Sequence, residues 1–168
     1  MNRVYNILTI IIQIVWTFIL SFAIYMFFAI LDTNFGIDGL FGLLIIQPIF
    51  GAILSILTIG VCLLVGLPIR LNKKINKWWT TNFYISIIGT VFGLALLMLA
   101  LIPKFNETIK IQLDGQETLK NIPNYILSYT GWFMTAFMTL HFFPPEIIKR
   151  KIETILNSNS GRSIKNAL

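Results

Sequence analysis

The chain has 168 residues, of which 56% are hydrophobic and only 12% are charged, and its formal net charge is +6. Soluble globular domains carry about 25% charged residues, so this composition excludes that class. One cysteine, Cys62, excludes a disulfide framework, and its place inside an apolar run predicts a small core residue.

Four long apolar runs organise the sequence, and they cover residues 4–31, 40–68, 80–103 and 124–143. None contains a Lys, Arg, Asp or Glu. A helix needs about 20 apolar residues to cross a hydrocarbon core about 30 Å thick, and each run meets that length. The first run exceeds the apolar stretch of about 7 to 15 residues in a secretory signal, so we expect it to be a permanent span. The sequence therefore predicts an all-α membrane protein, a four-transmembrane-helix bundle forming a single domain over residues 1–156.

One proline interrupts the second run. Pro48 lacks a backbone N–H and its ring crowds the preceding turn. We therefore expect a kink near Gln47 and Pro48, and a bent or interfacial start to this span over residues 36–42.

The cations gather in two segments. They are Arg70, Lys73, Lys74 and Lys77 between the second and third runs, and Lys149, Arg150, Lys151, Arg162 and Lys165 in the C-terminal tail. The two remaining connections have no cationic excess, so the positive-inside rule places both termini in the cytoplasm. The chain has 30 Ile against 5 Val, together with 12 Asn. Such a skew is typical of AT-rich bacterial genomes, so we expect a bacterial plasma (inner) membrane.

The basic connection is followed at once by two aromatic residues. Trp rings favour the headgroup region, and each cation near a charged leaflet contributes about 1 kcal/mol of attraction. The sequence therefore predicts membrane lipids as partners, with anionic headgroups bound on the cytoplasmic side. The residues of this predicted lipid-headgroup site are Arg70, Lys73, Lys74, Lys77, Trp78 and Trp79.

Small residues recur in the apolar runs and indicate where helices approach closely. Gly89 and Gly93 form a small-xxx-small pair in the third run, and Gly131 and Thr135 are spaced the same way in the fourth. We expect these four residues to mediate helix packing. The pattern leaves open whether the partners lie in one bundle, in a homo-oligomer or in a larger membrane complex.

Two amides lie inside the apolar runs. Gln13 and Gln47 would each cost several kcal/mol if left unpaired in hydrocarbon, so we expect structural hydrogen bonds between helices. The alternative is that Gln13, Gln47 and Ser55 line a path for a solute.

The groups that usually perform chemistry are sparse. His141 is the only histidine, and no second His, thiol pair or glycine-rich phosphate loop accompanies it. We therefore expect no enzyme activity, no cofactor, no metal site and no nucleic-acid partner. Ion-coupled transport is disfavoured because its relays place Asp, Glu or His inside the spans.

Two segments outside the apolar runs have their own patterns. Residues 104–123 alternate apolar and polar side chains around Asp114-Gly115, which predicts a small extracytoplasmic β-hairpin. Pro144 and Pro145 end the fourth run, and residues 145–156 segregate Ile and Leu from Lys and Arg. This predicts a C-terminal amphipathic helix on the inner leaflet, followed by a flexible cytoplasmic tail over residues 157–168.

These expectations favour a non-enzymatic integral membrane protein that acts as an accessory, scaffold or immunity-type subunit through helix packing and partner association. The alternative is a small carrier or oligomeric pore for an apolar or weakly polar solute. A water-filled cavity that reaches Gln47 would favour the carrier, whereas a solid bundle with an exposed apolar groove would favour the subunit.

Overall fold

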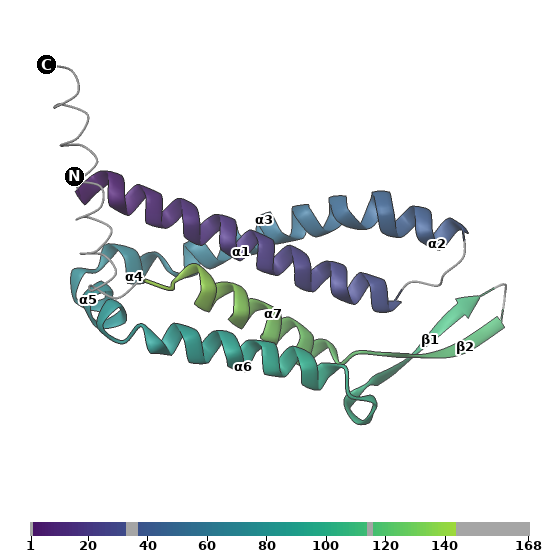
Figure 1. The fold of residues 1–168 in the computed structure, drawn as a ribbon. Coiled ribbons are helices and arrows are strands. Elements are labelled where there is room, and N and C mark those ends of the chain that lie inside the picture. Colours follow the sequence, from purple (N-terminus) through teal and green to yellow (C-terminus); the bar gives the residue numbers. More distant parts are fainter. Residues whose placement is uncertain (1, 33–36, 114–115, 144–168) are drawn as a thin grey trace, which may run out of the picture.

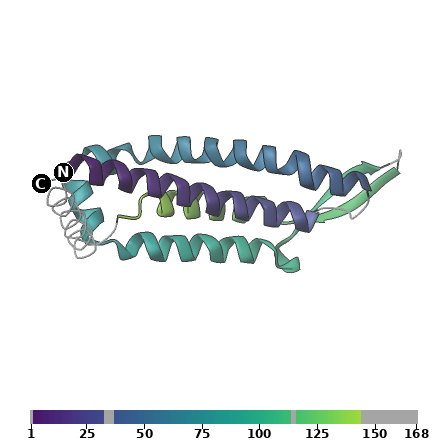
Figure 2. The ribbon, with the colours of Figure 1, turned by 45° about the horizontal axis from the view of Figure 1, so that its top comes forward.

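A computed structural model of the chain describes residues 2–32, 37–113 and 116–143. It is mostly helical, and its four longest helices run along one common axis (Figures 1 and 2). They are α1 (Asn2–Asp32), α3 (Gln47–Val65), α6 (Tyr84–Ala100) and α7 (Tyr125–Leu140). The predicted amphipathic helix at residues 145–156 and the predicted tail at 157–168 lie outside the described residues.

Two helical stretches, Ile7–Leu31 and Gly39–Val65, are long and apolar enough to cross a membrane. A third qualifies if α6 is joined to the preceding helix α5 (Lys73–Thr81), from which it is bent by 73°. The prediction of a helical membrane protein is confirmed to this extent. Helix α7 has 16 residues and reaches about 24 Å at about 1.5 Å per residue, so its length alone does not make it a span.

The second apolar run is helical from α2 (Ile37–Phe41) through a π-helical turn, η1 (Gly42–Ile46), into α3. In this turn the Gln47 N–H bonds to the Gly42 carbonyl, one residue further back than in an α-helix. Pro48 follows directly and has no N–H to continue the regular ladder. The irregularity predicted at Gln47 and Pro48 therefore takes the form of a wider turn just before them.

The basic connection is also helical, which the sequence did not indicate. It consists of α4 (Leu67–Leu71) and α5, separated by Asn72. The Asn72 side chain caps α5 by accepting bonds from the N–H groups of Lys74 at 3.0 Å and Ile75 at 3.3 Å. Because α5 extends to Thr81 and the chain then bends, α6 begins at Tyr84 rather than at residue 80.

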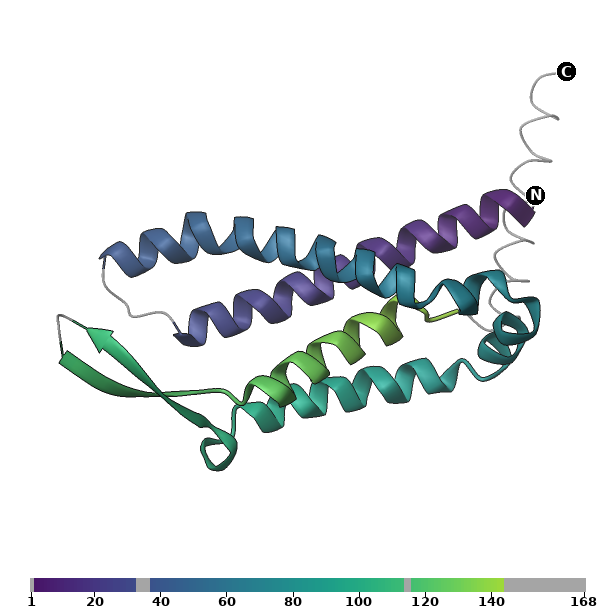
Figure 3. The same ribbon diagram turned by 180° about the vertical axis from the view of Figure 1, so that it is seen from behind.

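The predicted β-hairpin is confirmed. After a short 3-10 turn, η2 (Pro103–Phe105), strand β1 (Glu107–Leu113) pairs antiparallel with β2 (Gln116–Ile122). Leu113 lies opposite Gln116, and residues 114 and 115 between them lie outside the described residues. The hairpin projects beyond one end of the helices, whereas α4 and α5 lie at the other end (Figure 3).

Helix α7 is the centre of the bundle, because it packs against α1, α3 and α6 (Figure 1). Helices α1 and α3 also pack together, but α1 and α6 barely contact each other. The core cluster contains Ile59 and Cys62 of α3 with Ala136 and Leu140 of α7. Cys62 is thus a fully buried core residue, as predicted.

Candidate functional site

Polar side chains converge at the end of the bundle where α4 and α5 lie. We call this cluster the polar junction, and it consists of Gln13, Arg70, Trp79, Ser86 and His141. It forms where α7 ends, and the last carbonyl groups of a helix have no partner within that helix. The junction supplies those partners from α1, α4, α5 and α6.

Arg70 points from α4 into the bundle. Its Nη2 donates to Gln13 Oε1 at 3.0 Å and to the Leu140 carbonyl at 3.1 Å, and its guanidinium lies 5.8 Å from the Phe143 ring centroid. Burial lowers the pKa of this guanidinium, yet an arginine keeps its proton in proteins. A fixed positive charge therefore sits at the C-terminal end of α7, where the helix dipole favours it.

Gln13 is only 5% exposed and uses both ends of its amide. Its oxygen accepts from Arg70, and its nitrogen donates to the Phe142 carbonyl at 2.5 Å. Gln47 is likewise paired, because the Tyr25 hydroxyl donates to its oxygen at 2.5 Å. Both amides thus form the bonds between elements that their position in apolar runs predicts.

Trp79 and Ser86 share one acceptor. The Trp79 Nε1 donates to the His141 carbonyl at 2.8 Å and to Ser86 Oγ at 3.0 Å, and Ser86 Oγ lies 3.2 Å from the same carbonyl. The His141 ring is fully buried, with Nδ1 2.9 Å from the Phe137 carbonyl. This ring fills the space beside Gly66, where any side chain would collide with it.

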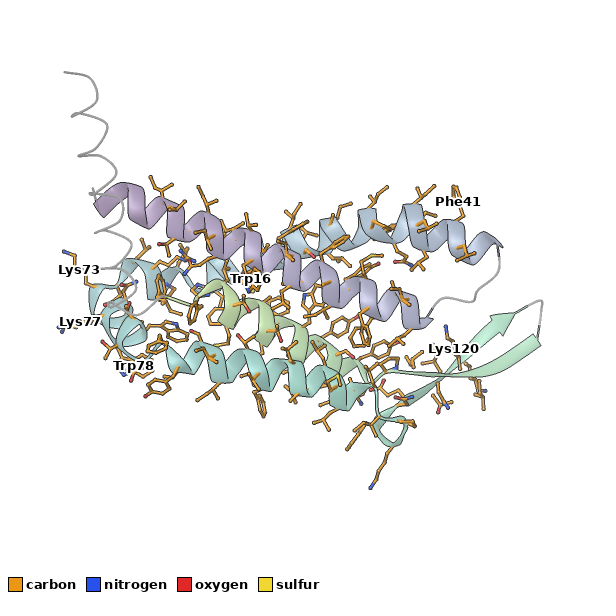
Figure 4. The ribbon with its side chains drawn as sticks, viewed as in Figure 1. Trp16, Phe41, Lys73, Lys77, Trp78 and Lys120 are labelled. Carbon is orange, nitrogen blue, oxygen red and sulfur yellow. The ribbon has the colours of Figure 1, made fainter. Side chains whose placement is uncertain are left out.

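The six residues of the predicted lipid-headgroup site therefore divide into two groups. Arg70 and Trp79 point into the polar junction, where Arg70 Nη2 and Trp79 Nε1 bond to groups of α1, α6 and the end of α7, while Arg70 Nε is buried without a partner. The other four side chains are exposed, and Figure 4 shows three of them extending from the end of the bundle. These four are Lys73, Lys74, Lys77 and Trp78.

Three of the four residues predicted to mediate helix packing meet at one point. A Cβ atom added to Gly93 would lie 2.8 Å from the Thr135 backbone nitrogen and 2.9 Å from the Gly131 carbonyl oxygen. A Cβ added to Gly131 would lie 2.7 Å from the Gly93 carbonyl oxygen. The backbones of α6 and α7 therefore touch here, whereas Gly89 faces the flexible side chain of Met138.

The three candidate solute-lining residues are not brought together. Gln13 belongs to the polar junction, and Gln47 lies at the start of α3, towards the hairpin end (Figure 1). Ser55 is fully buried in α3, and its hydroxyl has no hydrogen-bond partner.

The described residues form cavities on two flanks of the bundle. One has a volume of about 420 Å³ and lies between α1 and α6, with α7 at its base, and we call it the α1–α6 crevice. The other, of about 540 Å³, lies between α3 and α7, and we call it the α3–α7 groove. Gln47 and Ser55 line neither of them. Among the described residues, no group of three His, Cys, Asp or Glu side chains could hold a metal ion.

The sequence reasoning missed the roles of Trp79 and His141. A usable signal was the position of Arg70, which follows Pro68 within the apolar segment Leu67–Leu71, whereas the lysines lie in a polar segment. An arginine in that setting needs buried acceptors, and the free carbonyl groups at a helix C-terminus supply them.

Comparisons with models of protein families, with curated proteins and with solved structures find no match to this chain.

Proposed function

We propose that the chain is a four-span integral protein of a bacterial plasma membrane, with both termini in the cytoplasm. The central position of α7 supports the fourth span, because it packs against three helices that include both membrane-length segments. The exposed lysines of α5 support the orientation, since they lie at the opposite end from the hairpin (Figure 4).

We further propose that the protein is a non-enzymatic accessory, scaffold or immunity-type subunit that acts through partner association. The observation that carries this proposal is the pairing of the interior amides and of the Trp132 indole with groups on other elements, although the hydroxyl groups of Thr17, Ser55 and Thr135 have no partner. Gln13 bonds to Arg70, Tyr25 to Gln47, and Trp132 Nε1 to Thr58 Oγ1 at 3.0 Å. Groups that are used in this way hold helices together and do not form a continuous polar path for a solute.

The α3–α7 groove is the proposed surface for the partner. It is lined by Cys62, Val65, Tyr129, Thr130, Phe133, Met134 and Phe137. Tyr129 and Phe133 are 67% and 43% exposed, so aromatic rings are available on a surface that faces outward along the helices. Aromatic side chains commonly dominate the energetics of association because they bury a large area.

Photo-crosslinking in native membranes tests this proposal. A photoreactive amino acid placed at Phe133, in the groove, should yield a protein adduct of discrete mass, whereas one at Phe92 on the outer face of α6 should yield lipid adducts only. Phe92 is a matched control because it is also aromatic and is 54% exposed. Lipid adducts alone at both positions would contradict the proposal.

The second candidate function is a small carrier or an oligomeric pore for an apolar or weakly polar solute. The unpartnered hydroxyl of Ser55 favours it, because a fully buried polar group without a partner in the bundle would gain a hydrogen bond if a solute reached it. Proteoliposomes would decide this point. A flux of small uncharged solutes that falls when Ser55 is replaced by Val would support transport, and an impermeable vesicle would support the subunit.

A further inference from the structure

We propose that the α1–α6 crevice is a binding site for one anionic phospholipid, with an acyl chain in the crevice and the phosphate near the lysines of α5. This inference is independent of the proposed partner association, because it concerns the opposite flank of α7. It differs from a diffuse attraction between a basic surface and a leaflet, since it assigns the lipid to a defined cavity.

The size and the location of the crevice indicate a chain-like ligand. Its volume of about 420 Å³ falls within the range of about 300–1,000 Å³ that is typical of small-molecule sites. Trp16 and Val91 on its walls are 62% and 60% exposed, so the crevice opens sideways between two proposed spans, where lipid chains are the surrounding solvent.

The lining changes along the crevice in the way that an amphiphile requires. Thr9, Gln13 and Ser86 line the part nearest the polar junction, together with the apolar side chains of Ile12, Ile87 and Phe142. Trp16, Leu20 and Val91 follow further along α1 and α6, with Thr90 beside Val91, and line the part nearer the middle of the bundle. A phospholipid that lies with its ester groups at the polar part and its chain along the apolar part would match this order. An apolar cavity that stayed empty would lose the dispersion contacts of its walls.

The charge on α5, at the end of the bundle where the polar part of the crevice lies, favours an anionic headgroup. Lys73, Lys74 and Lys77 are exposed on α5, and no Asp or Glu occurs from residue 39 to residue 106. Lys73 and Lys74 occupy the first turn of α5, where the partial positive charge of the helix end adds to their own. This helix is attached to the crevice wall, because Trp79 of α5 bonds to Ser86 at 3.0 Å.

Native mass spectrometry of the full-length protein tests the site. The protein is exchanged into detergent with phosphatidylglycerol or with phosphatidylcholine carrying the same acyl chains, and the bound lipid is counted. We expect one retained phosphatidylglycerol and much less phosphatidylcholine. Replacing Lys73 or Lys77 by Gln should each weaken retention by about five-fold, which corresponds to about 1 kcal/mol per cation. Replacing Lys104, an exposed lysine beyond the other end of α6, should leave retention unchanged.

A pair of variants on α6 tests whether the acyl chain occupies the crevice. Val91→Trp fills the crevice from its rim, whereas Ile88→Trp adds the same ring at a site with 62% exposure that does not line it. We expect loss of the bound phosphatidylglycerol in Val91→Trp alone, with equal melting temperatures for the two variants. If Val91→Trp melts lower than Ile88→Trp, Ile12→Trp, which fills the crevice from an exposed position on the α1 wall, replaces it as the test and should lower retention.

Three results would overturn the proposal. Equal retention of the two phospholipids would remove the anionic specificity. Full retention in the crevice variants would show that the chain lies elsewhere. Displacement of the lipid by glycerol phosphate, which has the headgroup chemistry without a chain, would show that a soluble anion suffices.

Discussion

The two helix pairs of the bundle are held together in different ways. Helices α6 and α7 meet backbone to backbone, because the nearest atoms to a Cβ added at Gly93 include a backbone nitrogen and a carbonyl oxygen. Helices α1 and α3 meet through side chains. A Cβ added at Gly51 of α3 would lie 2.6 Å from Cδ1 of Tyr25 and 3.3 Å from the Phe22 ring, both on α1.

This difference decides how well each helix pair tolerates a larger residue in place of a glycine. A backbone in a packed helix cannot retreat without moving the whole helix, so Gly93 has no tolerated replacement that is larger. An aromatic ring can rotate or shift by a few tenths of an ångström, so the contact at Gly51 is more forgiving. The comparison therefore predicts that the stability lost on replacing a glycine depends on which atoms face it. Backbone atoms should make the loss large, and side-chain atoms should make it smaller.

The largest effect is expected for Gly93→Leu. The added side chain would enter a backbone contact, and overpacking of this kind costs about 3 kcal/mol or more. The free energy of unfolding from SDS titration in mixed micelles should fall by that amount. Gly60→Leu on α3 is the control, because no atom lies within 4 Å of a Cβ at that position. Equal losses for the two variants would mean that α6 and α7 do not pack as described.

A smaller effect is expected for Gly51→Ala. The Tyr25 ring must shift, but it is held by its bond to Gln47 and by an edge-on contact with Trp132 at 6.5 Å between centroids. We expect a loss of about 1 kcal/mol in the same titration. In a Tyr25→Leu background, the loss caused by Gly51→Ala should be smaller, because the Tyr25 ring that the new methyl group would displace is absent. An unchanged loss in the double variant would show that Tyr25 is not the obstacle.

The third effect is that of Tyr25→Phe, which removes the hydroxyl and keeps the ring. Hydrogen bonds between membrane helices average about 0.6 kcal/mol, so the free energy of unfolding should fall by about that much. Tyr129→Phe is the control, since Tyr129 is 67% exposed and stacks on Tyr125 without depending on its hydroxyl. A larger loss at Tyr129 would reverse the ranking of the two hydroxyl groups.

The sequence predicted local features of this fold better than contacts between distant segments. The alternation around Asp114-Gly115 indicated the hairpin, and the spacing of Gly89 and Gly93 indicated a packing face on α6. Such patterns show which face of a helix or strand carries the apolar or small residues, because they follow the helical or strand period. They do not identify the partner across that face, so the meeting of Gly93 with Gly131 came only from the structure.

The polar junction was hidden for the same reason. Gln13 and Phe142 are 129 positions apart, and no local pattern connects them. Arg70 was grouped with the lysines because they are close in sequence, although Asn72, which ends α4 and caps α5, separates their directions. The sequence did not predict helices α4 and α5, because each is short. Short helices gain most of their stability from packing, which a local sequence pattern does not show.

The smallest effect is expected for Gly89→Ala, on the same helix pair as Gly93. A Cβ at Gly89 would lie 2.6 Å from Met138 Cγ and 2.9 Å from its Cε, so the obstacle is a side chain with three rotatable bonds. Alanine also favours a helix by about 1 kcal/mol relative to glycine, which offsets the cost of moving Met138. We therefore expect a change within about 0.5 kcal/mol of zero, measured by the same SDS titration. A loss as large as that of Gly93→Leu would show that the whole face of α6 is rigid, and that the nature of the neighbouring atom does not set the cost.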